Sequence, residues 1–246
     1  MAPLNLIKIP IYADTFDMKS FSLFVVALSL GSPFASQAQA KSLVFFVPGG
    51  ASPVLTTMHR LMRQFENAGW PAANLSQHFY PYKGSLKRSC RVLRKSMDAE
   101  VERHPGGTPI VVVAHSLGQF IAMYCLAEAP WQNQIQRFIG LAGVANGQDS
   151  KPFGCGVKKC GEWVQFLTPY RNPNLVAWLQ KVGPVIQTWA PCSLYSPIDR
   201  FVDSPFDSGA LPYGDNYTIS DFSHLDFITR EDAYSTMAGA CGLDFQ

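Results

Sequence analysis

Hydrophobic residues along this chain gather in short continuous runs that are separated by longer segments of mixed character. The clearest run is Pro109–Val113, which is rich in β-branched residues and has no polar alternation. Such a run is typical of a strand buried on both faces, as in a parallel sheet. Further stretches complete the set of predicted strands, which are Ser42–Val47, Leu75–Tyr80, Ile135–Leu141, Cys192–Ser196 and Tyr217–Ser220.

The segments between these strands have helical character. In Thr56–Gly69 the apolar residues recur at steps of three and four, which predicts an amphipathic helix. Ser85–His104 is predicted to be a polar helix, and Phe120–Glu128 has the composition of a buried one. Strands that alternate with helices predict an α/β fold, with a mainly parallel sheet flanked by helices. Active sites on such sheets lie beyond the carboxyl ends of the strands.

The first forty residues form a pattern of a different kind. Met18 and Lys19 precede a ten-residue apolar run, and the small-x-small sequence Ala38-Gln-Ala40 follows. This arrangement is typical of a secretory signal peptide over residues 18–40, and its apolar run is too short to span a bilayer. We therefore expect residues 1–17 to be an extension or an untranslated stretch. The mature domain is expected to cover residues 41–246, without a transmembrane segment, and to be secreted or periplasmic. The alternative is a buried helix at the start of the fold.

Composition and cysteine content agree with an exported globular enzyme or binding protein. The chain is 47% hydrophobic and 15% charged with a formal net charge of +2, which argues against disorder and against nucleic-acid binding. All six cysteines fall in the predicted mature part, where disulfides can form, although the sequence leaves their pairing open. Cys155 and Cys160 enclose a short loop and are predicted to pair, because a zinc site there would need further ligands.

One stretch carries a chemical signal. In "VVVAHSLGQF", residues 111–120, the chain passes from a buried strand to a buried helix through Ser116, with Ala114 and Gly118 two positions to either side. Small residues at these positions permit a sharp nucleophile elbow, which presents the hydroxyl beside the N–H groups of a helix N-terminus. Ala114 replaces the first glycine of the common Gly-x-Ser-x-Gly pattern. The alternative is an ordinary turn.

A nucleophilic serine needs a base and an acid that orients the base. On an elbow of this type the acid and then the histidine follow the serine in the chain, and only His224 among the five histidines does so. His115 is adjacent to Ser116, but consecutive residues leaving a strand point to opposite sides. Asp199 follows the strand at 192–196 and is the predicted acid, with Asp203 as the second choice. For His224 the alternative is a surface-loop histidine.

An oxyanion hole requires two further donors. The backbone N–H of Leu117, directly after the serine, is the first predicted donor. The second is the N–H of Gly50, in the loop after the first strand, with Ala51 as an alternative. A plain turn at this glycine pair remains the other interpretation.

The segment 148–191 is longer than a simple connection and is interpreted as an insertion. It is predicted to form either a lid or acyl-pocket wall, or a packed subdomain without a role in substrate binding. Its large apolar residues are Trp163, Phe166, Tyr170, Leu175, Trp178, Leu179 and Trp189.

Together these residues resemble the α/β-hydrolase superfamily, and within it the small secreted bacterial lipases that carry Ala-His-Ser-x-Gly. The resemblance covers nearly all of Lys41–Gly242. It rests on "LVFFVPGGAS", "ENAGW", "AHSLG", "GLAGVANG", "LYSPIDRFV" and "DFSHLDF". It implies a compact α/β-hydrolase domain that hydrolyses carboxylic esters and needs neither a cofactor nor a metal. That group commonly has His-Gly where this chain has Pro48-Gly49, a departure that affects the hydrogen bonding of the oxyanion loop.

The predicted function is therefore cleavage of lipid or other acyl esters by Ser116, His224 and Asp199 through an acyl-enzyme. The substrate would be a small-molecule or lipid ester, with transient contact to a lipid interface. Two alternatives stay open. One is a glycan esterase or an acyltransferase that uses the same three residues, and the other is a non-catalytic binding protein with this fold.

Overall fold

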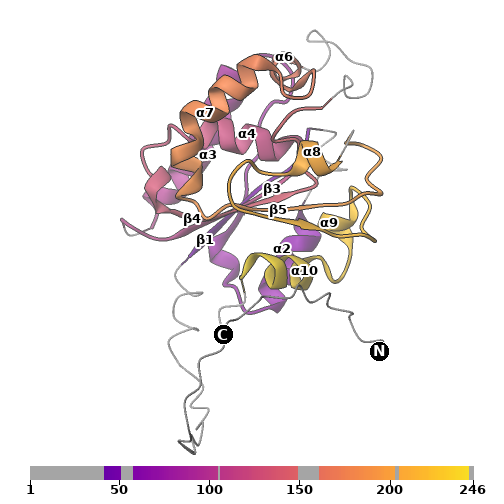
Figure 1. Ribbon diagram of the computed structural model, residues 1–246. Coiled ribbons are helices and arrows are strands. Elements are labelled where there is room, and N and C mark those ends of the chain that lie inside the picture. The colour runs from indigo at the N-terminus through magenta and orange to yellow at the C-terminus, as the bar shows by residue number, and fades with distance from the viewer. Residues whose placement is uncertain (1–41, 51–57, 105, 149–160, 203–204, 244–246) are drawn as a thin grey trace, which may run out of the picture. The chain divides into compact units, whose positions relative to one another are not determined.

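Six strands form one sheet, and every neighbouring pair of strands is parallel. The computed structural model describes residues 42–50, 58–104, 106–148, 161–202 and 205–243 of the chain, and all of them fall within a single compact unit. Figure 1 shows the elements in place. The strands are β1 (Leu43–Val47), β2 (Leu75–Gln77), β3 (Ile110–His115), β4 (Ile135–Leu141), β5 (Cys192–Tyr195) and β6 (Asp215–Thr218).

The helices connect these strands and are mostly amphipathic or buried. They are α2 (His59–Asn67), α3 (Leu86–Glu102), α4 (Leu117–Leu126), α6 (Trp163–Leu167), α7 (Pro173–Gln187), α8 (Pro205–Gly209), α9 (Asp226–Thr229) and α10 (Ala233–Cys241). The predicted α/β fold, with a parallel sheet flanked by helices, is confirmed.

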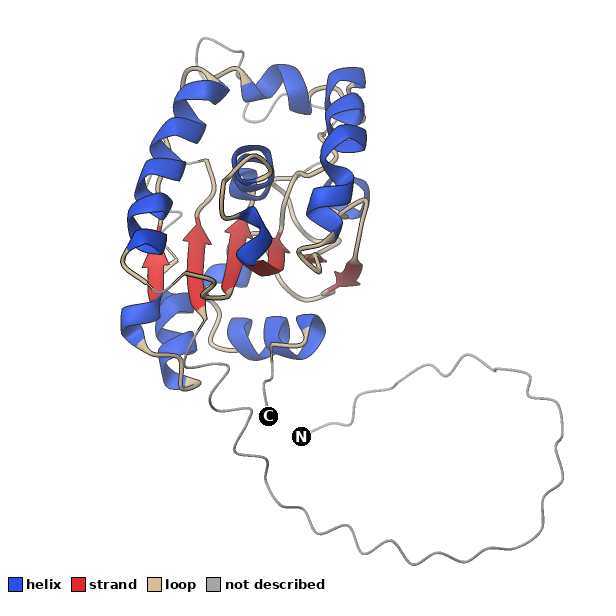
Figure 2. Ribbon diagram, turned by 90° about the vertical axis from the view of Figure 1, so that its left-hand side faces the viewer, coloured by secondary structure: helices blue, strands red, loops and turns tan. Residues whose placement is uncertain are grey.

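Side chains of the central strands alternate between two hydrophobic layers. Phe45 and Val47 of β1 face a layer shared with α3, α4 and α7, whereas Val44 and Phe46 face a layer shared with α2 and α10. Figures 1 and 2 show these two groups of helices on opposite sides of the sheet. Because both faces are covered, β1 is apolar at every position and β3 at all but its last, which is why these two strands appear in the sequence as unbroken runs.

The sequence prediction was wrong in the bounds of both edge strands. Strand β2 ends at Gln77, three residues before the predicted end at Tyr80, and β6 is displaced. We expected Tyr217–Ser220, and the strand is Asp215–Thr218, in register with Cys192–Tyr195 of β5. All four residues of β6 are exposed. An exposed edge strand needs no apolar pattern, so backbone pairing with β5 sets its position.

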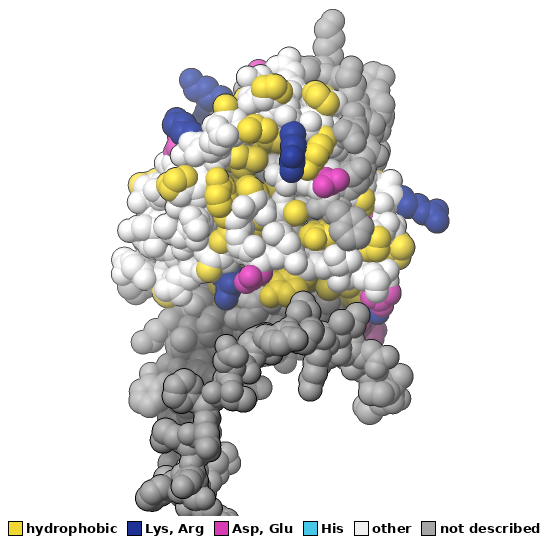
Figure 3. Space-filling model, viewed as in Figure 1, with side chains coloured by type: hydrophobic (Ala, Val, Ile, Leu, Met, Phe, Trp, Pro, Cys, Tyr) yellow, Lys and Arg dark blue, Asp and Glu magenta, His cyan; other side chains and the backbone are white. Residues whose placement is uncertain are grey.

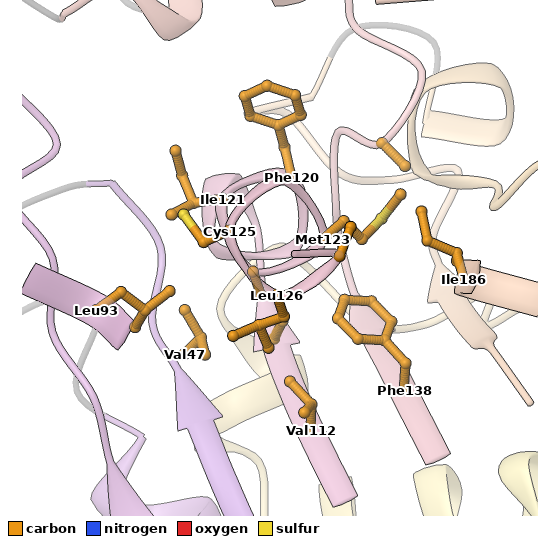
Figure 4. Packing of buried hydrophobic residues seen from close by; sticks show 14 of the residues in the cluster. Val47, Leu93, Val112, Phe120, Ile121, Met123, Cys125, Leu126, Phe138 and Ile186 are labelled. Atoms are coloured by element: carbon orange, nitrogen blue, oxygen red, sulfur yellow. The ribbon is translucent and has the colours of Figure 1, made fainter. Parts of the chain in front are cut away.

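Helix α4 lies at the centre of the first layer. Nine of its ten residues are buried, and it begins at Leu117, three residues before the predicted start. Figure 4 shows it with Ile121 and Cys125 on the side of Leu93 and with Met123 on the side of Ile186. Apolar contacts on all sides fix this helix, and with it the strand-to-helix corner that precedes it.

The order of the strands locates a crevice in the sheet. The strands lie in the order β2-β1-β3-β4-β5-β6 across the sheet. The chain therefore adds β2 on one side of β1 and then returns to place β3 on the other side. At such a reversal the connections leave in opposite directions, and ligands bind beyond the carboxyl ends of the two strands. Here those ends lead into Pro48-Gly49-Gly50 and into Ser116.

Two disulfides join elements that are distant in sequence. Cys90–Cys125 links α3 to α4, and Cys192–Cys241 links β5 to α10. The predicted Cys155–Cys160 bridge lies outside the described residues, as do the predicted signal peptide and residues 1–17.

Two further features of the described chain concern membrane-spanning helices and surface character. Within the described ranges, no helix has the length and apolar character needed to cross a membrane. On the face drawn in Figure 3, apolar side chains are interspersed with polar uncharged side chains and backbone, and few charged side chains are visible.

Candidate active site

Ser116 stands at the corner between β3 and α4 in a strained backbone conformation. Its φ is 54° and its ψ is −130°. A non-glycine residue held in such a region costs on the order of 1–3 kcal/mol, so its surroundings must impose the conformation. The Ser116 N–H donates to the Leu141 carbonyl at 2.8 Å, and the Ser116 carbonyl accepts from the Gln119 N–H at 3.0 Å. The corner places Ser116, which is half-buried, at the carboxyl end of a central strand.

Close packing around this corner explains two of the nearby glycines. A Cβ atom on Gly118 would lie 2.5 Å from the carbonyl oxygens of both Val47 and Pro48, so the first turn of α4 rests directly on the end of β1. A Cβ atom on Gly49 would lie 3.0 Å from Ser116 Cβ and 3.4 Å from Ser116 Oγ. The loop after β1 therefore reaches the serine hydroxyl.

Gly50 and Leu117, the residues of the two predicted oxyanion donors, are in contact through the side chain of Leu117. A Cβ atom on Gly50 would overlap the side chain of Leu117. Across the ranges that the structure describes, neither the Gly50 N–H nor the Leu117 N–H donates to a protein acceptor. The arrangement is suited to an oxyanion, which needs two unused donors. The alternative donor, Ala51, lies outside the described residues.

Asp199 and His224, which are 25 residues apart in sequence, form a buried pair. His224 Nδ1 lies 2.7 Å from Asp199 Oδ2. The second carboxylate oxygen, Oδ1, accepts from the N–H groups of Phe201 at 2.8 Å and Val202 at 3.2 Å. Asp199 thus holds its own loop with one oxygen and the imidazole with the other. The second choice, Asp203, lies outside the described residues.

Local hydrogen bonds fix the loop that carries His224. The Ser223 N–H donates to Asp226 Oδ2 at 2.6 Å, and hydrogen bonding from Ser223 lowers the pKa of the Asp226 carboxyl. On the other side of the loop, Arg230 forms an ion pair with Asp221 at 2.8 Å. The imidazole therefore extends from a loop braced at both ends.

His115 connects this loop to the corner at Ser116. Its Nε2 lies 2.8 Å from the backbone carbonyl oxygen of His224, and the two ring centroids are 4.7 Å apart. The structure thus brings His224 beside the residue that precedes Ser116. Among the described hydrogen bonds, none joins Ser116 Oγ to His224. In enzymes without substrate this bond is often long.

Sequence reasoning missed Gln119, which is fully buried in the first turn of α4. Its Nε2 donates to Ser193 Oγ at 3.3 Å, and its Oε1 accepts from the Ala145 N–H at 3.1 Å. A Cβ atom on Gly140 or Gly143 would overlap the Gln119 side chain, so these two glycines make room for it. Through these contacts Gln119 connects the corner to β5 and to the end of β4. An amide in a helix of mostly apolar residues is the sequence signal that could have identified it.

Phe201 was also missed. Its side chain is half-exposed, and its ring centroid lies 5.0 Å from that of His224. Ile198, on the other side of Asp199 in the same loop, is exposed to a similar degree. The buried Asp199–His224 pair is therefore bordered by the half-exposed ring of Phe201, and the loop of Asp199 carries a second exposed apolar side chain.

Comparison with known proteins rests on structure, since no family model matches the chain and no curated protein matches it in sequence. The mature lipase BlEst2 of Bacillus licheniformis superposes with a TM-score of 0.59 at 14% identity, over 81% of this chain and 91% of the lipase. The metagenomic carboxyl esterase MGS0156 gives 0.53 at 14% identity, over 84% of this chain and 75% of the esterase. The chain has the α/β-hydrolase fold.

This hydrolase fold supports more than one chemistry. Tomato methylketone synthase I, in a complex with 2-tridecanone, superposes on the chain with a TM-score of 0.53 at 11% identity, over 84% of this chain and 99% of the synthase. The fold alone therefore does not select a reaction, and the function must be argued from the site.

The described part of the predicted insertion packs on helix α4. Phe166 of α6 and Trp178 of α7 lie 6.3 Å and 6.0 Å from Phe120, measured between ring centroids, and both also contact Tyr124. Residues 149–160 lie outside the described residues. The insertion thus contributes to holding α4, and its role as lid or acyl-pocket wall stays a prediction.

The candidate site is made of ordinary side chains and backbone donors. Among the described residues, no group of three or more His, Cys, Asp or Glu side chains is arranged to hold a metal ion.

Proposed function

We propose that this protein is a serine hydrolase of carboxylic esters, with Ser116 as nucleophile, His224 as base and Asp199 as the acid that orients the base. One observation carries the proposal. A serine in a strained strand-to-helix corner lies at the same edge of the sheet as a buried Asp–His pair, and His115 joins the two by a hydrogen bond. This combination of groups activates a hydroxyl.

In the proposed reaction Ser116 Oγ attacks the ester carbonyl while its proton passes to His224 Nε2. Asp199 keeps the opposite ring nitrogen, Nδ1, as the donor and stabilises the imidazolium. The N–H groups of Leu117 and Gly50 stabilise the tetrahedral oxyanion. His224 then returns the proton to the departing alcohol, and water repeats the sequence on the acyl-enzyme.

The proposed substrates are lipid or other acyl esters. The half-exposed ring of Phe201 beside His224, and the exposed Ile198 in the same loop, support an apolar substrate. Two of the similar structures are called a lipase and a carboxyl esterase, which is in keeping with this class. We also propose that the protein acts outside the cytoplasm, because its two described disulfides suit an oxidising compartment.

A series of p-nitrophenyl esters from acetate to palmitate tests the proposal. The purified protein should hydrolyse the series, and Ser116→Ala should remove the activity together with covalent labelling by a fluorophosphonate. A maximum at long acyl chains would support a lipase. Activity only on acetylated glycans, or transfer of the acyl group to an alcohol, would replace the substrate class while keeping the three residues. Absence of both turnover and labelling would favour a binding protein.

A further inference from the structure

His115 is a fully buried histidine that the proposed mechanism leaves unused. It is the last residue of β3, and its Nε2 faces the carbonyl oxygen of His224 at 2.8 Å. A carbonyl oxygen can only accept a hydrogen bond, so Nε2 must carry the proton. The ring is then the Nε2–H tautomer, and its Nδ1 carries a lone pair.

The other ring nitrogen has no such role. Within the described chain, His115 Nδ1 is buried without a hydrogen-bond partner, and it lies 3.3 Å from where a Cβ atom on Gly49 would be. Burial, together with the nearby His224, lowers the pKa of His115 to about 3. The ring therefore stays neutral over the pH range in which a histidine base works.

A second buried histidine shows what a purely structural role looks like in this chain. His78 uses both ring nitrogens, with Ser76 Oγ at 2.7 Å and Ser96 Oγ at 3.0 Å. It thereby joins β2 to α3, and neither ring nitrogen is left without a hydrogen-bond partner. His115 instead leaves one nitrogen unpaired and directs its single hydrogen bond to the backbone of the proposed catalytic base.

We propose that His115 is a positioning residue for His224, holding the backbone carbonyl of the base so that its imidazole stays beside Ser116. The proposal rests on the proposed function. His224 is fixed at two points, through Nδ1 by Asp199 and through its carbonyl by His115. Because His115 is bonded directly to Ser116, the second contact ties the loop of the base to the strand of the nucleophile.

Neutrality is part of this role. His224 must become positively charged during the reaction, and the two ring centroids are only 4.7 Å apart. A cation at His115 would oppose that charge, whereas a neutral donor does not. A buried imidazole thus supplies an N–H at the required point without repelling the imidazolium.

The test compares His115→Gln with His115→Leu, using His78→Leu as the control. Glutamine can place an amide N–H near the position of Nε2, whereas leucine cannot. We expect His115→Leu to lower kcat for p-nitrophenyl butyrate and the rate of fluorophosphonate labelling by about 10- to 100-fold, as expected for a displaced catalytic group. KM should change by less than about twofold, and His115→Gln should recover kcat to within about threefold of the wild type.

Three outcomes would overturn the proposal. They are full activity in His115→Leu, equal losses in the glutamine and leucine variants, and an equal loss of kcat in His78→Leu. Full activity in His115→Leu would show that the contact is not needed for catalysis. The other two outcomes would show that the histidine acts only through general stability, which a parallel Tm measurement would detect.

A measurement on the unaltered ring keeps the proposal testable if the leucine variant does not fold. In nitrogen-15 NMR spectra of the wild type, His115 should show a proton on Nε2, a bare Nδ1 and no titration between pH 5 and pH 8, given its pKa of about 3. A proton on Nδ1, or titration in that range, would contradict it. If the wild type neither hydrolyses esters nor reacts with the fluorophosphonate, the proposed function fails, whereas the NMR result still reports on the hydrogen bond alone.

Discussion

At the residue scale, one carboxylate has two separate tasks. Asp199 Oδ1 is held by two backbone N–H groups of its own loop, which leaves Oδ2 directed at His224 Nδ1. A carboxylate can only accept here, so it keeps a proton on Nδ1 of the imidazole, and in the proposed mechanism Nε2 is then the nitrogen that acts as the base. The orientation of the ring and its tautomer therefore depend on the same contact.

Replacing Asp199 by asparagine separates the shape of this contact from its charge. An amide nitrogen in the place of Oδ2 would donate to Nδ1 and so move the imidazole proton to Nε2. We expect Asp199→Asn to lower kcat for p-nitrophenyl butyrate by about 10³- to 10⁴-fold with little change in folding. The matched control is Asp215→Asn, because Asp215 is exposed in the edge strand β6 and the same change of acid to amide there leaves the loop of His224 intact. A loss below about tenfold in Asp199→Asn would remove Asp199 from the proposed mechanism.

Residue types that are scarce could be identified from the sequence, but their partners could not. His224 is the one histidine after Ser116, and Asp199 directly follows a predicted strand, so each could be chosen before any contact was known. The structure then shows the two side chains in hydrogen-bond contact. The partner of His115 is a backbone carbonyl 109 residues further along the chain, which no local pattern specifies.

At the element scale, the site depends on how closely α4 approaches β1. Gly118→Ala would bring a Cβ atom to 2.5 Å from the carbonyl oxygens of Val47 and Pro48, neither of which can move without shifting β1. We expect a loss of about 1–3 kcal/mol in the free energy of unfolding, as for an overpacked core, together with a fall in esterase activity.

Gly239→Ala is the control for this substitution. Gly239 lies exposed in α10, and nothing is within 4 Å of its added Cβ atom. Alanine there should stabilise the protein by up to about 1 kcal/mol through its helix propensity. Urea unfolding of both variants measures the difference in the free energy of unfolding. If Gly118→Ala has the stability and activity of the wild type, the corner tolerates a wider spacing between α4 and β1.

The same scale shows why some elements were predicted more accurately than others. The predicted bounds of β4, Ile135–Leu141, agree with the structure, because five of its seven residues are buried and leave a largely apolar run in the sequence. Strand β6 has four exposed residues, so its position depends on pairing with β5 and was misplaced by two residues. A hydrophobic pattern indicates which positions are buried, and it indicates secondary structure only where burial follows the period of a helix or strand.

At the scale of the whole molecule, the two described disulfides strengthen opposite faces of the sheet. Cys90–Cys125 joins α3 and α4 in one layer, whereas Cys192–Cys241 joins β5 and α10 in the other. The sequence separations are 35 and 49 residues, so replacing either pair by alanine should cost about 2–4 kcal/mol of stability. Calorimetry of the two double variants should give similar losses. Only the loss of Cys192–Cys241 should also reduce activity, because β5 leads directly to Asp199.

Two of the buried histidines, His78 and His115, make the stability of the whole fold depend on acid. Burial, together with the charge of Arg103, lowers the pKa of His78 to about 4, and burial with the nearby His224 lowers that of His115 to about 3. Unfolded histidine has a pKa of about 6.5, so between pH 6.5 and pH 4 the unfolded chain binds protons that the folded chain excludes. The free energy of unfolding must then fall as the pH falls, by up to about 1.4 kcal/mol per pH unit for each of the two histidines. His78→Gln keeps groups able to bond with Ser76 and Ser96 but cannot titrate, so in urea unfolding at pH 4.5, 5.5, 6.5 and 7.5 its stability should fall less steeply. Equal slopes for the variant and the wild type would mean that His78 is protonated in the folded protein.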